Sequence, residues 1–97
     1  MSIRTLHMST RTLQSYPEFF DATISGDKTH EVRHESEVEN VRPGETFLLQ
    51  EFDPESGKYS GREALIQVTF ISPAPQSFLL AGYVLMSTRL YTPCFHW

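Results

Sequence analysis

The chain has 97 residues and a net charge of −4, with 39% hydrophobic and 12% aromatic residues. This length fits one domain with a modest core, and the hydrophobic content excludes a disordered chain. The weak acidic charge excludes a protein that coats nucleic acid through bulk positive charge, so any nucleic-acid contact requires a local basic patch.

Cys94 is the single cysteine, which excludes an internal disulfide and favours a reducing compartment. No apolar run approaches the roughly 20 residues that a membrane-spanning helix needs, and the N-terminal segment lacks the apolar region of a signal peptide. We therefore expect a cytoplasmic protein without membrane contact. A flexible extension is expected at residues 1–8, one domain at residues 9–89 and a tail at residues 90–97.

The first half of the domain predicts a strand, a helix and a second strand. Threonine and leucine favour a short strand at residues 9–14. Pro17 suits the first turn of a helix, and Gly26 ends that helix because glycine adopts the left-handed conformation at little cost. The predicted apolar face of the helix comprises Phe19, Phe20, Thr23 and Ile24. A strand follows at residues 28–34.

The second half predicts three further strands, at residues 46–52, 62–71 and 82–87. Segments rich in proline, glycine and acidic residues separate them, and an acidic loop at residues 35–40 comes before the first of them. Five strands and one main helix indicate the α+β class. Because a small sheet must protect its edges, we expect it to close into a β-barrel.

The strand at residues 28–34 is unusually polar, with Val32 as its one clearly apolar residue. Since side chains alternate along a strand, Thr29, Glu31 and Arg33 are expected to share one face. In one interpretation Glu31 and Arg33 form a surface ion pair of little energetic value. In the other they form the floor of a cleft, where Arg33 offers its planar fork to a phosphate or a base edge. Glu31 then orients Arg33 or accepts a proton.

Three motifs span residues 11–87 in a fixed order. They are Pro17-Glu18-Phe19-Phe20 followed by Ser25 to Arg33, then Gln50 to Glu55 with Gly57, Tyr59, Gly61 and Arg62, and finally Gly82-Tyr83-Val84-Leu85. Together they resemble the ASCH domain of the PUA-like superfamily, closest to a small ASCH-related bacterial and phage group of unknown function. The resemblance implies a small PUA-like β-barrel of five to six strands, one main helix near the N-terminus, and a cleft between helix and barrel.

ASCH domains are generally thought to bind RNA or nucleotides, so the resemblance implies a binding module for such a ligand. The candidate binding residues are Arg11, Gln14, Lys28, Thr29, Glu31, Arg33 and Tyr83. In this interpretation Lys28 and Arg33 contact phosphate, while Gln14 and Tyr83 shape the pocket. Tyr83 either stacks on a base or fills the core. Arg4, Arg11, Lys28 and Arg33 are expected to form a basic mouth on an otherwise acidic protein.

The resemblance also supplies an enzymatic alternative, because some small relatives are amidohydrolases acting on acetylated cytidine and some are reported to cleave single-stranded RNA. The relatives' strand reads Lys-Thr-x-Thr-x-Arg with the second threonine as proposed nucleophile, and Glu31 occupies that position here. Thr29 lies two residues away, about 6.5 Å along a strand, which is too far for the same attack. Lys28, Thr29 and Glu31 are the catalytic candidates for such a hydrolase.

Two further interpretations concern a protein partner and a metal. A third option for the function is a phage protein that engages a host protein through its surface. No cofactor is expected. His30 and His34 lie four positions apart on one strand, about 13 Å, which is too far to share an ion, so no metal site is expected.

Overall fold

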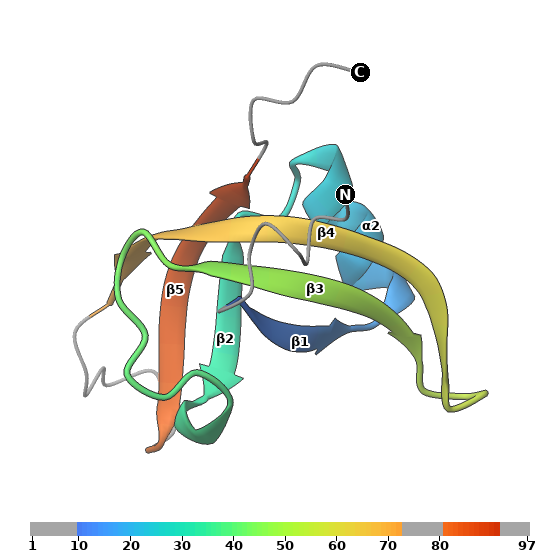
Figure 1. The fold of residues 1–97 in the computed structure, drawn as a ribbon, viewed down its shortest axis with the longest axis horizontal. Helices are drawn as coiled ribbons and strands as arrows, with labels where there is room; N and C mark the ends of the chain where they lie inside the picture. Colours follow the sequence, from blue (N-terminus) through green and yellow to red (C-terminus); the bar gives the residue numbers. More distant parts are fainter. Residues whose placement is uncertain (1–9, 73–80, 92–97) are drawn as a thin grey trace.

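The computed structural model describes residues 10–72 and 81–91, and these form one five-stranded sheet with one α-helix (Figure 1). The elements are β1 (Arg11–Ser15), α2 (Pro17–Ser25), β2 (His30–His34), the short 3-10 helix η1 (Glu35–Glu37), β3 (Thr46–Asp53), β4 (Lys58–Ile71) and β5 (Tyr83–Leu90). The α+β prediction is confirmed. The expected extension at residues 1–8 lies outside the described residues, as does the expected tail beyond Tyr91. Within the described residues, no helix has the length and apolar character needed to cross a membrane.

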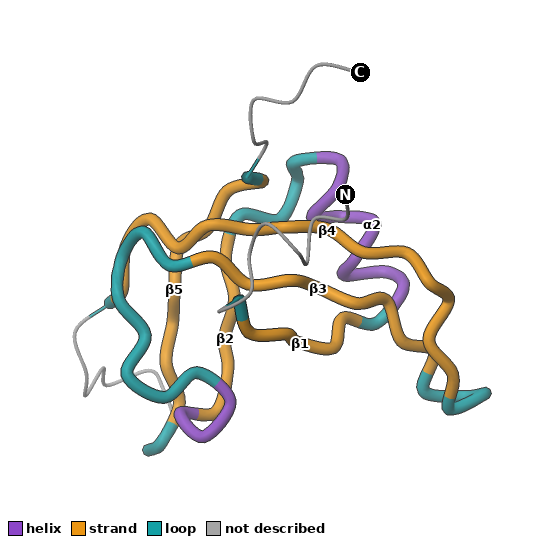
Figure 2. The backbone as a smooth tube through the Cα atoms, in the orientation of Figure 1, coloured by secondary structure: helices purple, strands orange, loops and turns teal. Residues whose placement is uncertain are grey.

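The sheet has the strand order β1-β3-β4-β5-β2, so β1 and β2 form its two edges. β1 pairs in parallel with β3, and the other neighbouring strands are antiparallel. The long strand β4 pairs with β3 along most of its length and with β5 toward its end, and the register shifts in both pairs. Such irregularities increase the twist of a sheet, and the sheet here curls strongly (Figure 2).

The curled sheet is a half-barrel and not the closed barrel expected from the sequence. Among the described strands, β1 and β2 do not pair with each other. The physical reason lies in the sequence of β2, since it directs the charged groups of Glu31 and Arg33 into the gap between the edges. The guanidinium of Arg33 reaches the backbone of β1 in place of a strand ladder.

The core comprises Leu13, Phe20, Val38, Phe47, Leu49, Ile66, Val68 and Met86. The helix α2 packs against β3 and inserts Phe20, which is 1% exposed. The predicted apolar helix face is narrower than expected, because Phe19 and Ile24 are exposed. The helix has only nine residues and packs a single stripe of side chains against the sheet, and Phe19 lies outside this stripe.

Arg62 fastens α2 to the sheet. Its guanidinium donates to Asp21 on α2 at 3.1 Å and to Glu51 on β3 at 3.3 Å, and it lies 4.8 Å from the centroid of the Phe20 ring. Arginine suits this position because its planar group can bond in the plane and stack on an aromatic face at once. The helix therefore holds a defined position beside the open edges of the sheet.

Candidate functional site

An open cleft of about 620 Å³ lies between the two edge strands and beside the start of α2. Its lining residues are Thr12, Leu13, Gln14, Ser15, Tyr16, Phe19, Lys28, His30, Glu31, Val32, Arg33, Glu37, Gln50 and Tyr59. The volume lies within the range of small-ligand sites. The unpaired edges of the half-barrel thus form the walls of the cleft, and its lining combines charged and aromatic side chains.

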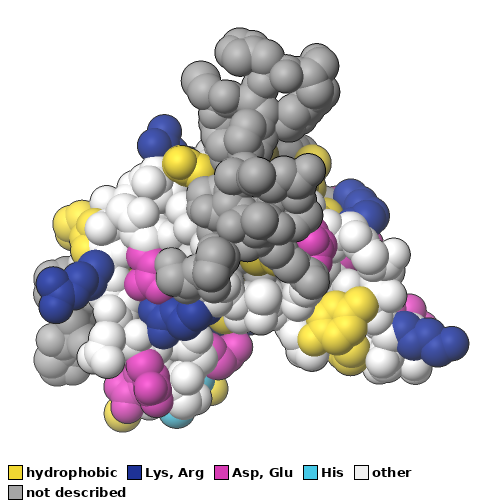
Figure 3. Space-filling view, viewed as in Figure 1, with side chains coloured by type: hydrophobic (Ala, Val, Ile, Leu, Met, Phe, Trp, Pro, Cys, Tyr) yellow, Lys and Arg dark blue, Asp and Glu magenta, His cyan; other side chains and the backbone are white. Residues whose placement is uncertain are grey.

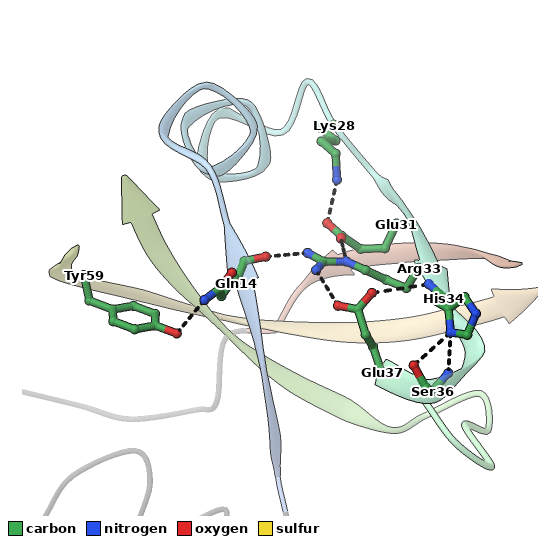
Figure 4. Close-up of polar contacts among 8 residues, drawn as sticks. All are labelled: Gln14, Lys28, Glu31, Arg33, His34, Ser36, Glu37 and Tyr59. Carbon is green, nitrogen blue, oxygen red and sulfur yellow. Dashed lines mark hydrogen bonds and ion pairs between the residues drawn. The ribbon is translucent and has the colours of Figure 1, made fainter. Parts of the chain in front are cut away.

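Glu31 is the buried charge of the cleft. Its side chain is 4% exposed, and its partner in the register of β5 is the fully buried Met86. The carboxylate accepts from the Lys28 ammonium at 2.5 Å and from the Arg33 guanidinium at 2.8 Å (Figure 4). A carboxylate in such surroundings persists only if it is paired and hydrogen-bonded. The interpretation of Glu31 and Arg33 as a surface ion pair is therefore wrong, because Glu31 lies inside.

Arg33 joins the two walls of the cleft. Besides Glu31, its guanidinium donates to a Glu37 carboxylate oxygen at 3.3 Å and to the backbone carbonyl of Gln14 at 2.7 Å. Gln14 lies on β1 and Arg33 on β2, so this side chain spans the opening of the half-barrel (Figure 4). Glu37 also accepts from the backbone N–H of His34 at 3.3 Å, which ties the 3-10 helix η1 to the same group of charges.

The turn after α2 places Lys28. Gly26 has φ 87°, a conformation that glycine adopts freely, and it ends the helix. The backbone N–H of Lys28 then donates to the carbonyl of Ala22 at 3.0 Å, which holds the turn against the helix. From there the Lys28 ammonium donates to the His30 carbonyl at 2.6 Å as well as to Glu31. The prediction that Lys28 lies at a cleft beside the helix agrees with this placement.

The other wall carries Gln14, a predicted site residue, and the aromatic residues Tyr16, Phe19 and Tyr59, which were not predicted at the site. The Gln14 amide donates to the Tyr59 hydroxyl at 3.0 Å, and the Tyr59 ring meets Phe52 edge to face at 5.0 Å. Tyr16 and Phe19 stack with their ring centroids 6.5 Å apart. The sequence signal for Tyr59 is its place in the second motif. The sequence predicts Phe19 on the buried face of the helix, so it gives no signal that Phe19 lies at the cleft.

Three predicted site residues do not line the cleft. The Arg11 guanidinium pairs with Glu45 at 2.6 Å at the start of β1. Thr29 is exposed, because β2 begins at His30 and the alternation of side chains does not extend back into the turn. Tyr83 meets the His34 ring edge to face at 5.3 Å at the start of β5, and it fills neither the cleft nor the core.

The charges of the cleft balance, since Lys28 and Arg33 are matched by Glu31 and Glu37. The expected basic mouth does not form from the described residues, because Arg11 pairs elsewhere and Arg4 lies outside them. On the face drawn in Figure 3, the positive side chains are spread out and do not gather into one patch. Within residues 10–72 and 81–91, no group of three or more His, Cys, Asp or Glu side chains is placed to hold a metal ion.

The geometry thus defines a small half-barrel domain with a polar, aromatic-lined cleft between its sheet edges. The chain belongs to the family described as a domain of unknown function (DUF3850), whose pattern matches residues 10–88 and so includes every residue that lines the cleft. A comparison with curated proteins finds no match to the chain.

Proposed function

We propose that this domain is a PUA-like module of the ASCH type that binds RNA or a nucleotide in the cleft. One observation carries the proposal. A buried carboxylate, Glu31, holds Lys28 and Arg33 in fixed positions on the floor of an open cleft. Burying a charge is costly, and a fold that needed only stability gains as much from apolar packing. The arrangement is therefore better explained by the hydrogen-bond donors that it holds in place.

Aromatic side chains at the cleft add to this argument. Tyr16, Phe19 and Tyr59 line the cleft and are 44%, 47% and 52% exposed. Exposed aromatic rings beside cationic groups are the usual composition of a site for single-stranded nucleic acid, where bases stack on the rings. The resemblance to ASCH domains points to the same ligand class, since the motif from Ser25 to Arg33 runs through the turn and β2.

A hydrolase acting on a modified nucleoside or on single-stranded RNA is the second candidate, and the site geometry weighs against it. Both oxygens of Glu31 accept from cations, which suits a positioning residue more than an attacking group. Thr29 lies outside the cleft lining, so it is not placed to replace the missing nucleophile. Incubation with acetylcytidine and with single-stranded RNA separates the candidates, because only a hydrolase releases a product.

The proposal is tested by removing both cations of the cleft. A variant with Lys28→Ala and Arg33→Ala is expected to bind single-stranded RNA at least about tenfold more weakly at low salt, measured by fluorescence anisotropy. The matched control combines Arg42→Ala with Arg89→Ala, which removes the same charge from residues outside the cleft. Circular dichroism verifies that both variants are folded. Equal affinity in the cleft variant and the control contradicts the proposal.

A further inference from the structure

We infer that the cleft takes the uncharged base of the nucleotide, that it prefers a base carrying carbonyl oxygens such as uracil or guanine over adenine, and that the phosphate stays outside. This inference rests on the proposed binding of RNA or a nucleotide and names the part of the ligand that is recognised. It is carried by the charge balance, by the remaining hydrogen-bond donors and by the aromatic walls.

The charge balance argues against a phosphate inside the cleft. Glu31 lies within hydrogen-bond distance of both cations, and Glu37 contacts Arg33 as well. A phosphate placed next to Lys28 or Arg33 is therefore also next to a carboxylate, which repels it about as strongly as the cation attracts it. The side chain of Glu31 is 4% exposed and bonded to both cations, so its charge lies beside any ligand that contacts them. A neutral ligand avoids this repulsion.

The donors that remain select the kind of neutral ligand. A lysine ammonium has three N–H groups and an arginine guanidinium has five. Lys28 uses two of its donors and Arg33 uses three within the described part of the chain. One N–H of Lys28 and two of Arg33 remain for a ligand. A carbonyl oxygen accepts from such N–H groups and carries no net charge for Glu31 or Glu37 to repel.

The bases differ in what they present to such donors. Guanine offers its O6 and N7 acceptors side by side, and uracil, like thymine, offers the O4 carbonyl. Adenine presents an amino group beside N7 and has no carbonyl oxygen, so it offers fewer acceptors to the remaining donors of Lys28 and Arg33. A flat ring also suits the walls, since the stacked pair Tyr16 and Phe19 lies on the helix side and Tyr59 lies on β4.

The test compares ligands that differ in one property at a time. Uridine, guanosine, adenosine, uridine monophosphate and inorganic phosphate are titrated into the full chain, with binding measured by calorimetry. Eight-residue oligo-U and oligo-A are compared by anisotropy at about 50 and about 300 mM salt. Uridine and guanosine are expected to bind at least about tenfold tighter than adenosine, and oligo-U tighter than oligo-A by a similar factor. Uridine monophosphate is expected within about threefold of uridine.

The outcomes separate this inference from the proposed function. The inference is overturned if uridine monophosphate binds more than about tenfold tighter than uridine, if inorganic phosphate competes with uridine monophosphate, or if oligo-A binds as well as oligo-U. In each of these cases RNA or nucleotide binding itself stands. If no nucleoside, nucleotide or oligonucleotide binds, the proposed function fails as well. Lys28→Met is expected to reduce the preference for oligo-U, whereas Arg42→Met is not.

Discussion

The carboxylate residue Glu31 pairs across the sheet with a methionine of β5 that is fully buried. Its two cationic partners, Lys28 and Arg33, have side chains only 17% and 15% exposed. Without the carboxylate, two positive charges would face each other in a partly buried space. The residue therefore contributes both to the stability of the domain and to the position of the donors in the cleft.

Glu31→Gln is expected to lower the free energy of unfolding by about 1–3 kcal/mol, because two charge-assisted hydrogen bonds are weakened at a buried site. Urea denaturation followed by circular dichroism measures the change. The matched control is Glu37→Gln, which alters a half-exposed carboxylate bound to the same arginine and is expected to cost less than about 1 kcal/mol. Equal losses in the two variants would mean that the burial of Glu31 has no energetic consequence.

Gly26 provides a second test at the scale of single residues. Its φ of 87° is left-handed, and a Cβ added there meets no atom within 4 Å. Gly26→Ala is therefore expected to cost about 1–2 kcal/mol through backbone strain alone. Gly26→Asn is expected to lower the stability measured by thermal unfolding less than Gly26→Ala does, since asparagine tolerates this conformation better than alanine. If the two variants are equally stable, another contact determines the turn.

At the scale of elements, α2 presents two adjacent phenylalanines to different surroundings. Phe20 is 1% exposed in the core, whereas Phe19 is 47% exposed and lines the cleft. The helix thus divides its aromatic residues between packing and the candidate site. Its position is set by Phe20 and by the contacts of Arg62 with Asp21 and Glu51.

Substitution of each phenylalanine separates these roles. Phe20→Ala is expected to destabilise the domain by about 3–5 kcal/mol because it empties a packed site. Phe19→Ala is expected to change stability by no more than about 0.5 kcal/mol and to weaken binding of single-stranded RNA by about fivefold or more, since one stacking surface is lost. Urea denaturation and anisotropy give the two readouts. A Phe19→Ala variant with unchanged affinity would remove this ring from the proposed site.

Most of the elements could be predicted from the sequence, because their signals are local. Pro17 and Gly26 mark the ends of the helix, and apolar residues mark the buried middle of β3 and of β4. The boundaries shift where a connection is shorter or longer than expected. β4 begins at Lys58 instead of residue 62, and β2 begins at His30 instead of residue 28. That second shift is why Thr29 was assigned to the wrong face.

The site was predictable only for residues close together in the chain. Lys28, Glu31 and Arg33 lie within one turn and one strand, so local spacing was sufficient to group them. Gln14 and Tyr59 meet across 45 positions of sequence, and no local pattern encodes that contact. The same limit applies to the open sheet, since pairing of β1 with β3 and of β2 with β5 depends on distant segments.

At the scale of the whole molecule, the domain leaves the edges of β1 and β2 unpaired with each other and spans them with a side chain. Open edges usually invite pairing with other chains. Here the charged groups of Glu31 and Arg33 lie along the gap, and charge at an edge discourages such pairing. The cleft and the protection of the edges therefore arise from the same residues.

Arg33→Met is expected to raise the amide hydrogen-exchange rates of β1 and β2 more than those of β3 and β4, because it removes the bond from Arg33 to the Gln14 carbonyl. Exchange measured by NMR under native conditions reports this difference strand by strand. Arg89→Met serves as control, since Arg89 bonds to Gln67 and does not line the cleft. A uniform change over all strands would show that Arg33 acts on global stability and not on the opening.

The strand order has a consequence for folding during synthesis on the ribosome. The two edge strands that flank the cleft, β1 and β2, lie within residues 11–34, yet β2 has β5, residues Tyr83–Leu90, as its neighbour in the sheet. During synthesis β1, α2 and β2 therefore emerge long before β2 can be anchored, and such long-range pairing forms late. A nascent chain that ends before residue 83 has the residues of the cleft without the strand that brings them together.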